Sequence, residues 1–273
     1  MTDASELRAA GAIRRDGAAP AVVLVHGFTG TPWELGTLAE ALSAAGYAVE
    51  APLLPGHGET PLALSRATWD GWLAHVERSV DEVLARHGSA VVIGFSLGSL
   101  LALVAGVARQ HRGVIALGAL GTALELPTLD ARVLRISEAM GRFLPNVNVP
   151  KFRGSDVRDP MAKRSNPAYA TQPLRAAREI LRGQREARAV LGSIAVPLLV
   201  VHGRADDTTP LAASLALVSA AERAEVELRV LPRSAHLLGR DVEHREVCDA
   251  VLGFVRRVTP ASAPRDSRSA SGL

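Results

Sequence analysis

The sequence has few of the residues on which metal sites, disulfides and nucleic-acid binding depend. Its 273 residues include one cysteine, Cys248, so no disulfide can form within the chain, and no cysteine or histidine pair has the spacing of a structural zinc site. Aromatic residues make up 4% of the chain, and the formal net charge is +3, without a basic patch that carries interleaved aromatics. We therefore expect no metal and no nucleic-acid partner.

Long hydrophobic runs are also absent. The apolar stretch at residues 97–108 is too short and too rich in glycine to span a bilayer, and residues 1–17 lack the apolar core of a secretory signal. We expect a cytoplasmic protein without a stable membrane anchor, and the sequence leaves its oligomeric state open. Residues 259–273 consist mainly of Ser, Ala, Pro and Arg without apolar periodicity, which predicts a disordered tail.

What the sequence does have is a series of short apolar runs separated by helical patterns. Hydrophobic residues make up 48% of the chain, enough for a sizeable core. Most of the runs are continuously apolar, as is typical of strands buried on both faces of a parallel sheet. They are residues 21–25, 47–51, 90–94, 114–117, 196–201 and 226–231. This alternation predicts an α/β fold with a mostly parallel central sheet and helices on both faces.

The best-marked helix follows the first run. Thr31 and Glu34 have the spacing of a capping box, Pro32 stands at the first helical position and Gly46 provides a stop. These signals predict a helix over residues 32–45.

The alternation is interrupted once. About 75 residues separate the fourth and fifth runs, more than one crossover needs, which predicts an insertion at about residues 121–192. Its first part has apolar residues on one helical face, namely Leu129, Val133, Ile136, Met140 and Phe143. We expect an amphipathic helix that lies over an apolar surface, and a second helix over residues 173–192 that returns to the sheet.

One serine lies between two glycines where an apolar run meets an apolar helix. The motif Gly94-Phe-Ser-Leu-Gly98 has the strand-turn-helix setting of a nucleophile elbow. Side chains at positions 94 and 98 would collide with the neighbouring strand and helix, and glycine relieves this crowding. The following helix points its N-terminal N–H groups at the serine, where negative charge develops on an attacked carbonyl. Ser96 is therefore a candidate nucleophile, and the alternative is a tight turn that contains a serine by chance.

A serine hydroxyl is a weak nucleophile that needs a base, and the base needs an orienting carboxylate. In an open α/β sheet such residues lie in loops at the carboxyl ends of strands, in the order serine, acid, histidine. The run at 196–201 leads into a loop with Asp206 and Asp207, and the run at 226–231 leads into a loop with His236. Both kinds of partner therefore follow strands in the required order.

Five motifs follow one another along the chain: His26-Gly-Phe-Thr-Gly30, Leu54-Pro-Gly-His-Gly58, Gly94-Phe-Ser-Leu-Gly98, Gly203-Arg-Ala-Asp206 followed by Thr209-Pro210, and His236. Together these residues resemble the α/β-hydrolase serine esterases, and more narrowly the small bacterial carboxylesterases and monoacylglycerol lipases, over roughly residues 20–257. One departure is Ser99, where such esterases often have a second glycine. The resemblance implies an α/β-hydrolase domain over residues 20–258 with a small cap insertion, and leaves residues 1–19 as an N-terminal segment.

The resemblance also implies roles for individual residues. Ser96 is expected to be the nucleophile, His236 the general base and Asp206 the acid that orients it. The backbone N–H groups of Phe28 and Leu97 are expected to form the oxyanion hole.

Two other carboxylates compete for the acid's position. Asp206 is favoured because it lies three residues after Gly203 and four before Pro210, the spacing of the resembling family. Asp207 is then a solvated loop charge, and Glu125, which follows the preceding strand, is a more distant alternative. The histidines at other strand ends and turns, including His26, His57 and His202, are expected only to form loop hydrogen bonds.

The expected activity is that of a cofactor-free serine hydrolase that cleaves small-molecule carboxylic esters through an acyl-enzyme. The resemblance favours short to medium acyl chains, with monoacylglycerols among the candidates. The helical stripe Leu129, Val133, Ile136 and Met140 either lines an acyl pocket as a lid or only covers the core. An acyltransferase, thioesterase, lactonase or carbon–carbon bond hydrolase would share every motif. A non-catalytic binding module would be expected to lack a triad member, and none is missing.

Overall fold

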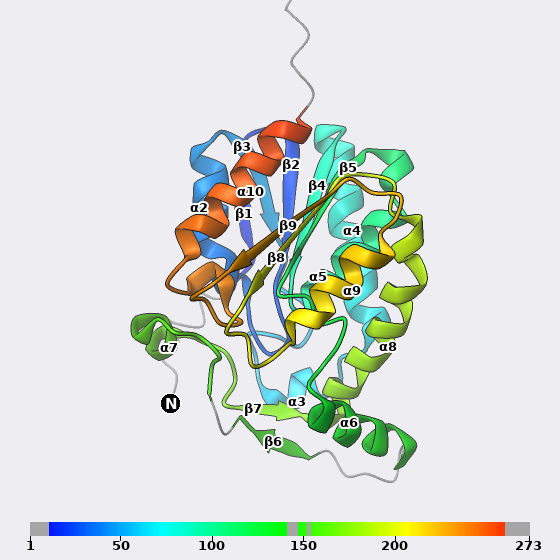
Figure 1. Ribbon diagram of the computed structural model, residues 1–273, viewed down its shortest axis with the longest axis vertical. Helices are drawn as coiled ribbons and strands as arrows, with labels where there is room; N and C mark the ends of the chain where they lie inside the picture. The colour runs from blue at the N-terminus through cyan, green and yellow to red at the C-terminus, as the bar shows by residue number, and fades with distance from the viewer. Residues whose placement is uncertain (1–10, 141–146, 152–153, 260–273) are drawn as a thin grey trace, which may run out of the picture.

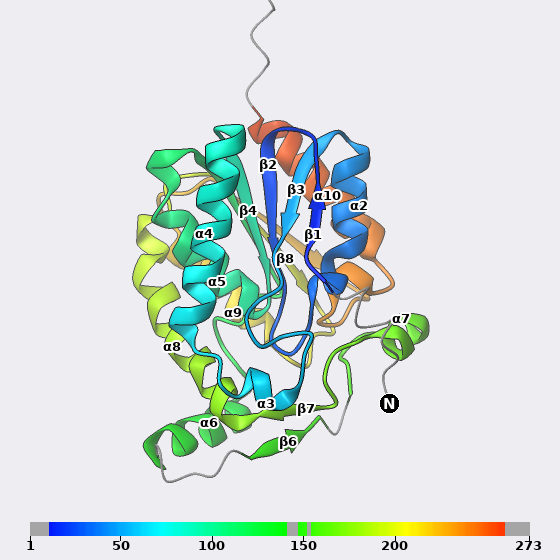
Figure 2. The same ribbon diagram turned by 180° about the vertical axis from the view of Figure 1, so that it is seen from behind.

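The computed structural model describes residues 11–140, 147–151 and 154–259 of the chain (Figures 1 and 2). At its centre lies a seven-stranded sheet in the order β1-β3-β2-β4-β5-β8-β9, in which every pairing is parallel except that of β1 with β3. The strands are β1 (Ile13–Arg15), β2 (Ala18–Val25), β3 (Tyr47–Ala51), β4 (Ala90–Phe95), β5 (Val114–Leu120), β8 (Leu198–Gly203) and β9 (Val226–Leu231). The predicted mostly parallel sheet is confirmed.

Helices cover both faces of this sheet (Figures 1 and 2). One face packs against α2 (Gly36–Ala44) and α10 (His244–Val258), and the other against α4 (Trp69–His87), α5 (Leu97–Val107), α8 (Leu174–Val190) and α9 (Leu211–Ala220). Shorter helices are η1 (Pro32–Leu35), α3 (Pro61–Leu64), η2 (Gln110–Arg112), η4 (Leu191–Ser193) and η5 (Leu238–Arg240). Each face of the sheet therefore has its own apolar core.

The sheet begins earlier in the chain than the sequence predicts. β1 lies in the segment 1–19 and pairs antiparallel with β3, with Ile13 opposite Ala51. β1 has the sequence Ile-Arg-Arg, and both arginines are exposed, so no apolar run marks it as a strand. β1 is held by its backbone pairing with β3 and by the ion pair of Arg14 with Glu50 at 2.9 Å. The predicted boundary at residue 20 therefore leaves out one strand and the start of β2.

The predicted helix at 32–45 begins as the 3₁₀ turn η1 and continues as α2. Thr31 caps it as expected, because its hydroxyl accepts a hydrogen bond from the Trp33 N–H at 3.4 Å. The glutamate of the expected capping box has a different partner, since Glu34 Oε2 accepts from the Gly27 N–H at 2.8 Å. The Glu34 carboxylate fills the space beside Gly30, where a Cβ atom would lie 2.1 Å from Glu34 Oε1.

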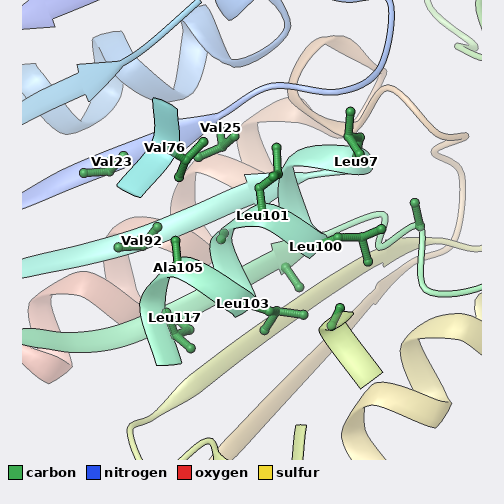
Figure 3. Packing of buried hydrophobic residues seen from close by; sticks show 14 of the residues in the cluster. Val23, Val25, Val76, Val92, Leu97, Leu100, Leu101, Leu103, Ala105 and Leu117 are labelled. Atoms are coloured by element: carbon green, nitrogen blue, oxygen red, sulfur yellow. The ribbon is translucent and has the colours of Figure 1, made fainter. Parts of the chain in front are cut away.

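Helix α5 is apolar on all sides because it packs between the sheet, α4 and α8. Leu100, Leu101 and Leu103 are fully buried. Figure 3 shows them among the buried side chains of this core, to which Val92 of β4 and Leu117 of β5 also belong. Burial of a leucine side chain contributes roughly 1.5–3 kcal/mol relative to an exposed one. The helix that follows Ser96 is therefore firmly held by the core.

In the part of the predicted insertion that the structure describes, four elements precede α8. They are α6 (Thr128–Met140), β6 (Asn148–Pro150), α7 (Pro160–Ser165) and β7 (Thr171–Pro173). β6 and β7 pair antiparallel as a separate two-stranded ribbon. Both views show α6, β6 and β7 together at the lower end of the molecule (Figures 1 and 2).

Helix α6 does not pack as the sequence predicts. Val133 and Ile136 are 46% and 62% exposed, so they do not lie over an apolar surface. Among the side chains of this helix that the structure describes, Leu134 is the buried apolar one, and it packs against Ala177 and Leu181 of α8. Packing against α8 therefore buries a face of α6 that lies beside the predicted stripe and not the stripe itself. The side chains of Leu129 and Met140, the whole of Phe143 and the predicted tail at 260–273 lie outside the described residues.

Candidate active site

Ser96 lies between β4 and α5, where the chain turns sharply. Its backbone has φ 54° and ψ −118°, outside the regions that residues with side chains favour. A Cβ atom at Gly94 would lie 1.9 Å from the Gly98 carbonyl oxygen, and one at Gly98 would lie 2.1 Å from the Val25 carbonyl oxygen. This close approach of backbone explains why both positions are glycine.

The structure brings Ser96, Asp206 and His236 together. His236 Nε2 lies 2.9 Å from Ser96 Oγ, and His236 Nδ1 lies 2.8 Å from Asp206 Oδ2. With its proton on Nδ1, the imidazole donates to the carboxylate and presents the lone pair of Nε2 to the serine hydroxyl. The side chain of Asp206 is fully buried and that of His236 is 11% exposed. Ser96 and His236 are each 9% exposed as whole residues, so little solvent reaches this chain of hydrogen bonds.

The charges at the site favour a protonated histidine next to an ionised acid. Burial lowers the pKa of His236, but the Asp206 carboxylate raises it, with smaller contributions from Asp156 and Glu34, and its net pKa is raised above the ordinary 6.5. Burial raises the pKa of Asp206, but the His236 ring and other hydrogen bonds lower it, and its net pKa is below the ordinary 3.8. The site therefore stabilises the imidazolium that forms when His236 accepts a proton.

Thr209 and His202 also contact Asp206, and the sequence assigned neither of them to this site. Thr209 donates to Asp206 through its N–H at 2.8 Å and through its hydroxyl at 3.0 Å. His202 Nε2 lies 3.4 Å from Asp206 Oδ2 and 3.1 Å from the Thr209 carbonyl oxygen. His202 lies at the end of the predicted strand before Asp206, and Thr209 belongs to the Thr209-Pro210 motif after it. The sequence therefore places both residues near the acid but does not indicate that they contact it.

The other candidate acids have different partners. The Asp207 N–H donates to Asp156 Oδ2 at 2.9 Å. Glu125 Oε1 lies 3.9 Å from the Arg188 guanidinium, and its side chain is 43% exposed. The carboxylate that contacts His236 is thus the one the sequence favours.

The two residues expected to form the oxyanion hole lie on segments that approach each other. Leu97 is the first residue of α5, and N–H groups in the first turn of a helix have no partner within that helix. The loop 27–30 that contains Phe28 follows β2 and lies against this helix end, since a Cβ atom at Gly98 would lie 2.6 Å from the His26 carbonyl oxygen. The two expected N–H donors therefore come from adjacent pieces of backbone.

The remaining strand-end histidines form loop hydrogen bonds, as predicted. His26 Nδ1 lies 2.9 Å from the Gly27 carbonyl oxygen, and its Nε2 accepts from the Leu54 N–H at 3.0 Å. His57 Nδ1 lies 3.3 Å from the Pro55 carbonyl oxygen. Burial lowers the pKa of His57 to about 4 and that of His26 well below its ordinary value, so both rings are neutral near pH 7.

Among the described residues, no three histidine, cysteine or acidic side chains are arranged to hold a metal ion. Within the same part of the chain, no helix combines the length and apolar character needed to cross a membrane.

Comparison with known proteins identifies relatives over most of the chain. Residues 17–243 match the family model Hydrolase_4, described as serine aminopeptidase, S33. A thermostable monoacylglycerol lipase of Bacillus sp. (strain H-257) is 29% identical over 233 residues, which cover 85% of this chain and 89% of the relative. A carboxylesterase of Bacillus subtilis (strain 168) is 23% identical over 244 residues, which cover 87% and 93%.

Solved structures share the fold. One, from a study of two metagenome-derived lipolytic enzymes called LipS and LipT, has a TM-score of 0.83 and 26% identity, and covers 91% of this chain and 98% of its own. A monoacylglycerol lipase of Paleococcus ferrophilus has a TM-score of 0.76 at 20% identity, over 91% and 98% of the two chains. The family model, the relatives and these structures confirm the predicted resemblance to α/β-hydrolase esterases.

Proposed function

The chain belongs to the serine aminopeptidase S33 family of α/β-hydrolases, and from this premise we propose that it cleaves carboxylic esters through an acyl-enzyme on Ser96. The family description names a peptidase, whereas the relatives are described as a monoacylglycerol lipase and a carboxylesterase. The chain is accordingly a carboxylic ester hydrolase, and the proposal concerns its mechanism and substrate.

The observation that carries the mechanism is the position of the His236 ring, with one nitrogen 2.9 Å from Ser96 Oγ and the other 2.8 Å from Asp206 Oδ2. His236 removes the hydroxyl proton while Ser96 Oγ attacks the ester carbonyl carbon. Asp206 stabilises the resulting imidazolium. The N–H groups of Phe28 and Leu97 donate to the oxyanion of the tetrahedral intermediate.

Collapse of the intermediate breaks the bond to the alcohol, which leaves with the proton from His236. Water then attacks the acyl-enzyme, and the same histidine accepts the water's proton and returns it to Ser96 as the acid departs. Because the mechanism requires neutral His236, activity falls as the pH drops through the raised pKa of this residue.

The proposed substrate is a small ester with a short to medium aliphatic acyl chain, and monoacylglycerols are the first class to examine. The descriptions of the relatives support this choice. The residues Leu129, Val133, Ile136 and Met140 stay candidate acyl contacts. For Val133 and Ile136, such contact requires a substrate that reaches their exposed side chains.

The nucleophile is tested with a fluorophosphonate probe and a series of p-nitrophenyl esters. Ser96→Ala is expected to abolish labelling and to lower kcat/KM by about 10⁴-fold or more, because members of a triad act as a unit. Ser219→Ala, at an exposed position of α9, is the matched control and is expected to keep both the labelling and the wild-type kcat/KM. Labelling that persists in Ser96→Ala would contradict the assignment.

The reaction class is tested with a panel that compares monoacylglycerols, thioesters, lactones and aminoacyl p-nitroanilides at equal concentration. Esters are expected to be cleaved fastest. Preferential release of nitroaniline would favour the peptidase activity that the family description names.

A further inference from the structure

The segment 154–159 of the insertion lies between the loop that carries Asp206 and the loop that carries His236. Its central residue is Asp156, which is partly buried. Asp156 Oδ2 accepts hydrogen bonds from the Asp207 N–H at 2.9 Å, the Thr208 N–H at 3.0 Å and the Thr208 hydroxyl at 2.9 Å. One carboxylate oxygen thus holds the two residues that directly follow Asp206.

The same segment is bonded to the histidine loop. The carbonyl oxygen of Asp156 accepts from the Leu237 N–H at 3.0 Å, next to His236. The fully buried Asp241 adds a second connection, since its Oδ1 accepts from the Arg158 N–H at 2.8 Å and its Oδ2 accepts from the Ala235 N–H at 2.7 Å. The residues on both sides of His236 are therefore tied to the insertion.

We propose that Asp156 is a positioning residue, which holds the Asp206 loop and the His236 loop at the separation that the triad requires. This inference rests on the proposed function. It gives the insertion a role in assembling the active site. A side chain and a backbone carbonyl of one residue restrain both loops, so their relative displacement would have to break several hydrogen bonds together.

Asp156 also acts on His236 through its charge. The ionisable groups around the His236 ring are Asp206, Asp156 of the insertion, Glu34 of η1 and His202 of β8. The three carboxylates raise the pKa of His236, and burial lowers it. Removing the charge at 156 is therefore expected to lower the pH at which His236 becomes protonated.

The test compares Asp156→Asn and Asp156→Ala with the wild type in kcat, KM and the pH profile of kcat/KM. Asparagine keeps an oxygen that can accept the same bonds, so Asp156→Asn is expected to retain most of kcat while its acid limb moves to lower pH by a few tenths of a unit. Asp156→Ala is expected to lower kcat about tenfold or more with little change in KM, because the loops lose their common restraint. Asp249→Asn, at an exposed position of α10, controls for the loss of one negative charge.

Two results would overturn the inference. The first is that both Asp156 variants keep the wild-type kcat and the wild-type acid limb of the kcat/KM profile, while the fluorophosphonate still labels Ser96. The other is an equal shift of the acid limb in Asp249→Asn, which would assign the effect to net charge. If Asp156→Ala does not fold, the pH profile of kcat/KM in Asp156→Asn is the deciding measurement, and an acid limb at the wild-type pH would contradict the inference. Absence of Ser96 labelling in the wild type would instead overturn the proposed function, and this inference with it.

Discussion

The hydrogen bond that Glu34 forms in the folded protein differs from the one that its local sequence predicts. Its spacing from Thr31 predicts a capping box, yet its carboxylate accepts from the Gly27 N–H, one residue before Phe28. The side chain is buried, and burial raises its pKa to about 7, with the Gly27 hydrogen bond and Lys151 acting in the opposite direction. An acid with this pKa changes charge near neutral pH, directly beneath the expected oxyanion loop.

We expect Glu34→Gln to have a higher free energy of unfolding than the wild type. This difference between the two proteins is expected to be larger at about pH 8 than at about pH 5. The pKa of Glu34 is about 7 in the folded protein against an ordinary 4.5, so the folded state holds this proton more tightly than the unfolded state does. Its contribution to stability is present below pH 4.5 and is lost as the pH rises through about 7. Glutamine has no such ionisation.

Thermal unfolding midpoints of both proteins at the two pH values measure this difference. Glu40→Gln, at an exposed position of α2, is the matched control and should behave alike at both pH values. A Glu34→Gln effect that is independent of pH would contradict the buried ionisation.

At the scale of elements, α4 and α8 meet where a glycine faces a tryptophan. A Cβ atom at Gly183 would lie 2.5 Å from the Trp69 ring. The ring is fully buried, and its Nε1–H donates to Glu186 Oε2 at 2.7 Å, so it has little freedom to move. Close approach of the two helices therefore depends on the missing side chain.

Gly183→Ala and Gly253→Ala are expected to change stability in opposite directions, although both put alanine inside a helix. At Gly183 the new methyl group overlaps the Trp69 ring, which is expected to cost about 1–3 kcal/mol of unfolding free energy. At Gly253, in α10, the new Cβ atom has no neighbour within 4 Å apart from the adjoining backbone of its own helix, and better helix propensity is expected to contribute about 0.5–1 kcal/mol. Urea unfolding of the three proteins measures both changes. Equal effects of the two variants would show that the Trp69 contact adapts.

At the scale of the whole molecule, buried ionisable groups gather at the carboxyl end of the sheet. His26, His57 and His202 are all fully buried, and burial lowers the pKa of each. Glu34, in the same region, has a raised pKa. Acidification therefore acts on the fold through the same end of the molecule that carries the active site.

The fold is expected to lose stability as the pH falls from about 6.5 towards 4.5. In the unfolded chain the three histidines bind protons near their ordinary pKa of 6.5, whereas in the folded protein they stay neutral to lower pH, so the unfolded state binds more protons. Glu34 and His236 act in the opposite direction, because the pKa of each is raised in the folded protein, but they are two groups against three.

Thermal or urea unfolding at several pH values between about 4.5 and 7 follows this loss. The decline should be steeper in Glu34→Gln, which removes one of the two opposing groups. A midpoint that stays constant or rises on acidification would contradict the expectation.

Much of the fold could be predicted because its signals are local. The runs at 21–25, 90–94 and 196–201 have the continuous apolar character of strands that are covered on both faces, and the sheet contains them within three residues at each end. The motif around Ser96 likewise specifies a turn that only glycine neighbours allow. Because parallel strands end at one edge, Asp206 and His236 could be expected near Ser96 before any distance was known.

The sequence by itself determined the layer order of the fold and that Ser96, Asp206 and His236 come together at the carboxyl edge of the sheet. Only the tertiary structure decided that β1 joins the sheet, which face of α6 is buried, that Glu34 bonds to Gly27 and that Asp156 connects two loops. The physical reason is the distance along the chain over which each interaction acts. Periodicity and turn chemistry act between neighbours in the chain, whereas these contacts depend on how segments distant in sequence approach one another once the sheet and its cores have formed.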